Sequence, residues 1–164
     1  MTESRQKVVF VCLGNICRSP QAEYIVAQRA SERGLADKFI FESAGTGDWH
    51  VGNRADTRSQ AKAREHGIDM HAHRAQQITA KNTRRWDWFV AMDRHNQRDL
   101  MQMGVPADRI LMMRQAEAGF ANNPDVPDPY YGAGDGFETV YQILLQNADA
   151  ILDVLNEKAV ELRA

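Results

Sequence analysis

The sequence predicts one α/β domain, residues 1–164, in which a parallel sheet carries helices on both faces. Short apolar runs alternate along the chain with segments whose apolar residues recur at helical spacing. Such alternation is typical of parallel strands joined by helices. A chain of 164 residues is also long enough for a single domain with its own core.

Four apolar runs are the expected strands, and they cover residues 8–11, 39–43, 88–92 and 110–113. In open sheets of this kind, ligands bind beyond the carboxyl ends of the strands, where the strand order reverses. The segment after the first run is therefore the favoured position for a site.

The expected helices lie between and after these runs. Glycines are placed to end the first three, at positions 34, 67 and 104. Asp56 is expected to cap the second helix, and the third covers residues 93–103. The apolar face of the first helix is formed by Ala22, Ile25, Val26 and Ala30. The last helix has the longest apolar stripe, which we expect to lie in the core: Phe137, Val140, Tyr141, Leu144, Leu145, Ala148, Ile151, Leu152 and Leu155.

The composition is that of an ordinary globular protein, with a net charge of −2 that does not favour a nucleic-acid partner. No apolar run is long enough to span a membrane, and the polar start lacks the pattern of a signal peptide. The chain has two cysteines, close together, which fits a reducing compartment better than a disulfide scaffold. A cytoplasmic protein without a membrane partner is expected.

Residues 12–19 read Cys-Leu-Gly-Asn-Ile-Cys-Arg-Ser and follow directly on the first strand. Ser19 and Pro20 are expected to open the first helix, as its N-cap and first helical residue. Helix N-termini attract anions because their first N–H groups lack partners within the helix and the helix dipole is positive there. The same field would favour the thiolate of Cys12, the nucleophilic form of the side chain. Loop 12–19 therefore predicts a phosphate site with a nucleophilic sulfur.

Less specific explanations of the Cys-x5-Arg spacing exist. The spacing arises by chance, and free cysteines are commonly small buried hydrophobes. Cys12 and Cys17 could also be half of a zinc site, but their spacing is unusual and no second pair exists. The position of the loop after a strand, and a glycine at position 14 that can take an unusual backbone conformation, favour catalysis.

The run from Val8 to Pro20 resembles the signature of the low-molecular-weight protein tyrosine phosphatases. Three further blocks match this family in the same order, at residues 42–46 (Glu-Ser-Ala-Gly-Thr), 91–93 (Ala-Met-Asp) and 128–132 (Asp-Pro-Tyr-Tyr-Gly). The resemblance implies a four-stranded parallel sheet of the Rossmann-like or flavodoxin-like kind. It also implies hydrolysis of phosphotyrosine and small aryl phosphates through a phosphocysteine, releasing inorganic phosphate, with no metal or other cofactor.

The expected catalytic residues are Cys12, Arg18 and Asp128. The planar fork of Arg18 can bind two phosphate oxygens, and backbone N–H groups from Leu13 to Arg18 should supply the other donors. The proline after Asp128 restricts its backbone to extended conformations, so a stiff loop could present the carboxylate. An Asp-Pro pair alone indicates only a turn; the resemblance assigns Asp128 the role of general acid.

The resemblance also implies that Asn15, Ser19, Ser43 and a later histidine form a network that supports the loop. Asn15 could adopt a left-handed conformation, and Ser19 could donate to the Cys12 thiolate. The histidine is either His71 or His73, because the chain has one residue more than the family spacing between Gly67 and Gln77. Counting back from Gln77 favours His73.

Flat apolar walls are needed for a phosphotyrosine ring, and the candidates are Leu13, Trp49, Tyr130 and Tyr131. Trp49 lies in a glycine-rich loop, where an aromatic side chain tends to be exposed and to mark recognition. We expect Trp88 in the core instead. Ile16 favours tyrosine, since relatives that act on phosphoarginine tend to carry threonine at that position.

Cys17 is expected either to pack beneath the loop or to form a reversible disulfide with Cys12 that protects the nucleophile, as the family resemblance supports. The expected partners are phosphotyrosine-containing proteins or peptides. A weak homodimer through Tyr130 and Tyr131 is also conceivable.

Three other functions fit the sequence less well. A thiol-dependent arsenate reductase would need further cysteines after Cys17, and there are none. A phosphotyrosine-binding module without activity would not require Asp128. An RNA-binding role for Arg84 and Arg85 rests on a short charged patch that we expect to be solvated surface.

Overall fold

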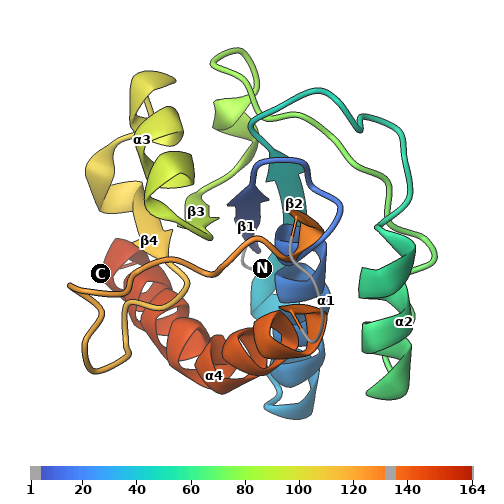
Figure 1. The fold of residues 1–164 in the computed structure, drawn as a ribbon. Coiled ribbons are helices and arrows are strands. Elements are labelled where there is room, and N and C mark those ends of the chain that lie inside the picture. Colours follow the sequence, from blue (N-terminus) through green and yellow to red (C-terminus); the bar gives the residue numbers. More distant parts are fainter. Residues whose placement is uncertain (1–4, 132–135, 164) are drawn as a thin grey trace.

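The computed structural model describes residues 5–131 and 136–163. Four parallel strands form one sheet in the order β2-β1-β3-β4, as Figure 1 shows. The strands are β1 (Gln6–Cys12), β2 (Phe39–Gly45), β3 (Trp88–Ala91) and β4 (Ile110–Met112). The predicted fold is confirmed, with β1 and β2 longer than expected and β3 and β4 each one residue shorter.

Four α-helices connect or follow the strands: α1 (Arg18–Glu32), α2 (Thr57–Glu65), α3 (Arg94–Gln102) and α4 (Gly136–Arg163). Single 3₁₀ turns occur at η1 (Ala36–Lys38), η2 (Thr83–Arg85), η3 (Ala107–Arg109) and η4 (Pro129–Tyr131). None of the helices in the described part of the chain is both long enough and apolar enough to cross a membrane.

The sheet is buried on both faces because successive side chains of a strand point to opposite sides. In β1, Val8 and Phe10 belong to the core beneath α1 and α4, whereas Val9 and Val11 belong to the core on the side of α3. Trp88 is buried, as predicted. The continuous apolar run of β1 therefore reflects a central strand covered on two faces.

The helix ends follow the local signals with one exception. The Asp56 carboxylate accepts from the N–H of Arg58, and Asp93 forms a capping box with Asn96. The prediction that Ser19 caps α1 was wrong. Helix α1 begins at Arg18, its N-cap residue is Cys17, and no side chain caps it.

The apolar stripe of α4 is narrower than predicted. Seven of its nine residues are buried, but Phe137 is half-buried and Leu145 is 39% exposed. An α-helix buries only the stripe that faces its neighbours, and Leu145 lies at the edge of that stripe.

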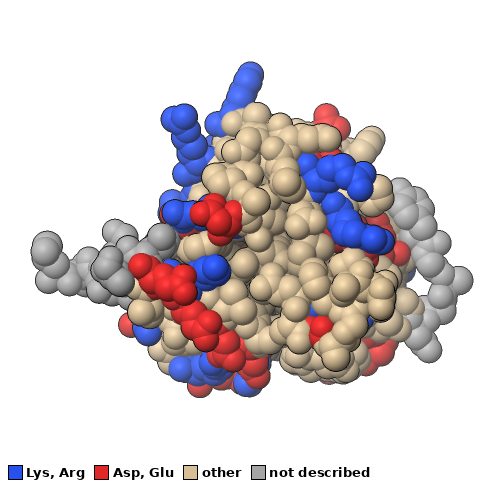
Figure 2. Space-filling view, turned by 90° about the vertical axis from the view of Figure 1, so that its left-hand side faces the viewer, with Lys and Arg blue, Asp and Glu red and all other residues tan. Residues whose placement is uncertain are grey.

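The strand order places a topological switch point at the carboxyl end of β1. The chain moves from β1 to β2 on one side and then crosses to β3 on the other side of β1. The loops that leave the sheet here diverge, and ligands of open α/β sheets bind in the resulting crevice. Loop 12–19 lies at this point. The face in Figure 2 carries both basic and acidic side chains with uncharged surface between them.

We predict that Leu152→Ala lowers the free energy of unfolding by about 2–5 kcal/mol, because it leaves a cavity in the core between α4 and the sheet. The control is Leu145→Ala on the same helix, which removes the same atoms from an exposed site and should cost about 0.5 kcal/mol or less. Urea unfolding followed by circular dichroism measures both. Equal losses for the two variants would contradict the packing described here.

Candidate active site

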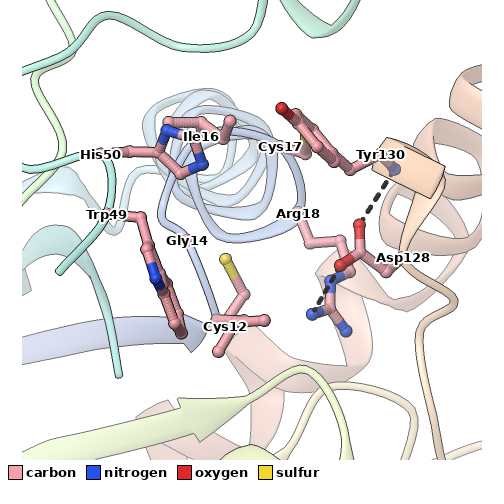
Figure 3. Close-up of a pocket in the computed structure, with 10 residues that line it drawn as sticks. Cys12, Gly14, Ile16, Cys17, Arg18, Trp49, His50, Asp128 and Tyr130 are labelled. Atoms are coloured by element: carbon pink, nitrogen blue, oxygen red, sulfur yellow. Dashed lines mark hydrogen bonds and ion pairs between the residues drawn. The ribbon is translucent and has the colours of Figure 1, made fainter. Parts of the chain in front are cut away.

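A pocket of about 280 Å³ opens at the carboxyl end of β1. Loop 12–19 forms its floor, and two other segments form its sides (Figure 3). The lining residues are Cys12, Leu13, Gly14, Ile16, Cys17, Arg18, Trp49, His50, Asp128 and Tyr130. The structure thus brings together the three residues that the sequence predicts to be catalytic.

The sulfur of Cys12 lies among hydrogen-bond donors. Ser19 Oγ is 2.9 Å from Cys12 Sγ, and the N–H of Asn15 donates to the sulfur at 3.2 Å. The N-terminus of α1 adds the positive end of its dipole. These groups suit a nucleophilic sulfur. The N–H groups of Gly14, Ile16 and Cys17 make no hydrogen bond within the described residues. The loop can therefore hold both a nucleophilic sulfur and an anion above it.

Asn15 is the residue that bends the loop. Its φ of 58° is the only positive value among the non-glycine residues described, as its short polar side chain allows. Gly14 does not have a positive φ; its lack of a side chain instead gives room to His50, whose Cδ2 would lie 3.0 Å from a Cβ at this position. The prediction of a left-handed conformation at Asn15 is confirmed, and the positive φ of the loop is at Asn15 and not at Gly14.

Three groups fix the Asn15 conformation. Its side-chain amide donates to Ser19 Oγ at 2.9 Å and accepts from the N–H of Gln76 at 2.9 Å. Its carbonyl lies 2.8 Å from Nε2 of His73, and Nε2 must carry the proton because a carbonyl only accepts. Burial lowers the pKa of His73, which keeps the ring neutral. His71 is exposed, so His73 is the histidine of the network.

Ser43 takes part in this network through an intermediate residue. Its hydroxyl donates to Glu23 Oε1 at 2.7 Å, and its carbonyl accepts from the side chain of Gln76 at 3.0 Å. Among the described residues, Gln76 links Ser43 to the network, and this glutamine was not predicted from the sequence. Burial and the nearby charge of Glu42 raise the pKa of Glu23 to about 7.

Arg18 is fixed by groups from two other loops. Its Nη1 lies 2.7 Å from Asp93 Oδ2 and donates to the carbonyl of Val126 at 3.0 Å. The guanidinium is almost completely buried, so these bonds hold its fork in one orientation beside the pocket. Asp93 belongs to the Ala-Met-Asp block of the sequence, but its contact with Arg18 joins residues 75 positions apart.

Asp128 approaches the pocket from the side opposite Trp49 (Figure 3). One carboxylate oxygen accepts from the N–H of Tyr130 at 3.0 Å, and the other lies 3.7 Å from Arg18 Nη2. The side chain is 31% exposed, so water can reach it. A carboxyl group held here can exchange protons with a leaving group or with water.

The walls of the pocket are mostly apolar. Leu13, Trp49 and Tyr130 line it as predicted, and Ile16 adds to its apolar lining. The side chain of Tyr131 lies outside the described part of the structure. His50 was not predicted, although it follows Trp49 in the same glycine-rich loop; its ring centroid is 6.0 Å from that of Tyr130.

Cys17 also lines the pocket, as a free and buried thiol. Burial raises its pKa, and the negative charges of Asp56, Cys12 and Asp128 raise it further. Cys17 is therefore a neutral thiol at physiological pH and does not compete with Cys12 as a nucleophile. The disulfide between the two cysteines stays a prediction.

One group of side chains outside the pocket has atoms close enough to hold a metal ion, namely Glu65, His66 and Glu138, within 4.8 Å of one another. The ammonium group of Lys62 already lies 2.8 Å from Glu65 and 3.1 Å from Glu138. This lysine supplies the positive charge that a metal would otherwise bring.

Glu23 should make stability depend on pH. Its pKa of about 7 lies above the ordinary value of 4.5, so the folded state binds the proton more tightly than the unfolded chain. The tighter binding of this proton stabilises the folded state. The stabilisation is fully present below pH 4.5 and is lost as the pH rises to about 7.

We predict that the free energy of unfolding of Glu23→Gln, relative to that of the unmodified protein, increases by about 1–3 kcal/mol from pH 5 to pH 8. Glu157→Gln, at an exposed site on α4, controls for the loss of one charge. Urea unfolding at both pH values measures the gain. A gain no larger than that of the control would show that Glu23 does not titrate as described.

Comparisons with known proteins agree with this geometry. The family model of the low molecular weight phosphotyrosine protein phosphatases matches residues 7–161. The low molecular weight protein-tyrosine phosphatase A of Mycobacterium tuberculosis is 42% identical over 152 residues, which cover 92% of each chain. YfkJ from Bacillus subtilis superimposes with a TM-score of 0.86 and 34% identity, covering 95% of this chain and 98% of its own. The Drosophila arginine phosphatase DARP superimposes with a TM-score of 0.81 and 31% identity, covering 92% of this chain and 98% of its own.

A family match over almost the whole chain, together with a site that brings Cys12, Arg18 and Asp128 into one pocket, shows that this protein belongs to the low-molecular-weight protein tyrosine phosphatases.

Proposed function

We propose that Cys12, Arg18 and Asp128 hydrolyse the phosphotyrosine side chains of proteins, with small aryl phosphates as further substrates. The observation that carries this proposal is the position of the Cys12 sulfur, at the floor of a pocket with apolar walls and among donors that suit a phosphate. The membership of a tyrosine phosphatase family supports the same reaction.

In the first step, the Cys12 thiolate attacks phosphorus and forms a sulfur–phosphorus bond. The bond between phosphorus and the phenolic oxygen breaks, and Asp128 gives its proton to that oxygen. The products are a neutral phenol and a phosphocysteine. Asp128 is now a carboxylate.

In the second step, a water molecule attacks phosphorus while Asp128 takes up one of its protons. The sulfur–phosphorus bond breaks, and Cys12 leaves as a thiolate. Inorganic phosphate is the product. Both steps conserve protons and charge, and Asp128 ends the cycle protonated.

Throughout both steps the transferred group keeps its charge on three equatorial oxygens. The Arg18 fork and the N–H groups of loop 12–19 suit these oxygens. Because Asp93 and Val126 fix the guanidinium beforehand, it needs little reorganisation when charge develops. Ser19 stabilises the Cys12 thiolate before attack and after its release.

The apolar walls favour an aromatic leaving group. The indole of Trp49 and the ring of Tyr130 lie on different sides of Cys12 (Figure 3). Ile16 supplies a further apolar surface, which supports phosphotyrosine over phosphoarginine because a guanidine group would need polar partners there. The expected cytoplasmic location and the weak homodimer stay predictions.

We predict that Cys12→Ser abolishes hydrolysis of an aryl phosphate in EDTA and that Asp128→Asn lowers kcat by about 10²–10⁴-fold, as expected for loss of a general acid. Initial rates for 4-nitrophenyl phosphate and for a phosphotyrosine peptide measure both effects. Activity that survives Cys12→Ser would identify a different nucleophile. Hydrolysis of a phosphoarginine peptide in preference to the phosphotyrosine peptide would overturn the proposed substrate.

We also predict that Asp93→Asn lowers kcat/KM by about 10–100-fold, because Arg18 loses the nearer of its two carboxylate partners and small displacements of such groups are costly. Asparagine still caps α3, so the melting temperature should change little. The control is Asp125→Asn, which removes a carboxylate that contacts the first residue of α3 and not Arg18. Similar activity losses in both variants would argue against a role through Arg18.

A further inference from the structure

Gly47 lies directly against the indole ring of Trp49. A methyl group on Gly47 would overlap the Cε3 and Cζ3 atoms of that ring and would lie 3.1 Å from Cη2. Non-bonded carbon atoms do not come as close as this Cβ would come to Cε3 and Cζ3. The ring therefore occupies the space that any side chain at position 47 would need. The position of Trp49 in the pocket therefore depends on a glycine two residues earlier.

The backbone of Gly47 is not free to move away. Its N–H donates to the carbonyl of Leu13 at 2.9 Å, and the N–H of Thr46 donates to the carbonyl of Cys12 at 2.9 Å. The carbonyl of Thr46 in turn accepts from the side chain of Gln77 at 3.3 Å. Since this stretch is tied to the catalytic loop, a side chain at Gly47 would displace the indole and not the backbone.

The indole can move at little cost to the fold. Trp49 is 70% exposed, so other rotamers place it in solvent without opening the core. The φ of Gly47 is not positive, so alanine is compatible with its backbone conformation. A methyl group there would thus remove the wall that faces Asp128 and Tyr130 and would leave the fold intact (Figure 3).

We propose that Gly47 is a specificity-determining residue, because its missing side chain lets Trp49 lie along the pocket and select phosphate esters with a flat aryl group. This inference rests on the proposed hydrolysis of phosphotyrosine. Gly47 acts through Trp49 and is a positioning residue. Binding of the phosphate group itself belongs to loop 12–19 and does not depend on Gly47.

The test compares Gly47→Ala, Trp49→Ala and the double variant. Loss of an aromatic contact should raise KM for a phosphotyrosine peptide by about three- to tenfold, with kcat unchanged. The inhibition constant of inorganic phosphate should not change in any of the variants, because phosphate does not reach the wall. In the Trp49→Ala background, adding Gly47→Ala should have no further effect on KM.

A second readout does not depend on activity. The chain has three tryptophans, and Trp86 and Trp88 are 5% and 2% exposed, so added iodide quenches mainly the fluorescence of Trp49. The Trp49 signal is the difference between each protein and its Trp49→Ala counterpart. Gly47→Ala should change its emission maximum and its quenching. Gly136→Ala is the matched control, since a Cβ there meets only ordinary contacts at 3.8 Å or more.

Three results would overturn the inference: an unchanged KM for Gly47→Ala, a full further rise of KM in the Trp49→Ala background, or a parallel rise in the inhibition constant of phosphate. The last would show that Gly47 acts on the catalytic loop. If the unmodified protein does not hydrolyse the phosphotyrosine peptide, the proposed function fails. In that case an unchanged Trp49 signal in Gly47→Ala separately refutes the placement of the indole.

Discussion

The structure depends on one constraint, which is that the turn from β1 into α1 must leave the N–H groups of Gly14, Ile16 and Cys17 without partners among the described residues. A side chain that capped α1 would satisfy some of these donors and would compete with a phosphate for them. The helix therefore begins at Arg18 without a side-chain cap, and Ser19 contacts the Cys12 sulfur instead of the helix backbone. A site for an anion is kept open at the expense of helix stability.

The loop needs support from elsewhere because this conformation is unfavourable by itself. A left-handed residue such as Asn15 costs about 1–2 kcal/mol relative to an ordinary backbone conformation. Its side chain and carbonyl bond to three groups, two of which, Gln76 and His73, come from a segment about sixty residues away in the chain. The same segment pairs with the end of β2, where the N–H of Gly45 donates to the carbonyl of Gln76 at 2.8 Å. The catalytic loop is thus rigid only when the surrounding fold is complete.

The sequence predicts what is encoded locally. The four strands, the ends of α1, α2 and α3 and the cysteine loop all follow from residues within a few positions of one another. The partner of Arg18, the bond from Ser43 to Glu23 and the part played by Gln76 are contacts between distant segments, and no local pattern contains them. The Ser19 cap failed for the same reason. Serine before proline is a good local signal for a helix start, but the Ser19 hydroxyl contacts Cys12 Sγ and does not accept a hydrogen bond from the helix backbone.

Catalysis and substrate choice are placed on different parts of this fold. In the proposed reaction, backbone groups of loop 12–19 and Arg18 bind the phosphate, and these groups do not distinguish one leaving group from another. The walls come from the segments around Trp49 and Tyr130, whose side chains are exposed and can vary without disturbing the core. The two parts meet at Asp128, because the N–H of Tyr130 donates to one carboxylate oxygen of this proposed general acid. A substrate ring that packs against Tyr130 therefore lies beside Asp128. A leaving group too small to fill the pocket makes the same phosphate contacts, but its oxygen is not held next to the Asp128 carboxyl group. In the proposed reaction, the link between Asp128 and Tyr130 therefore makes the step that breaks the ester bond depend on the shape of the leaving group.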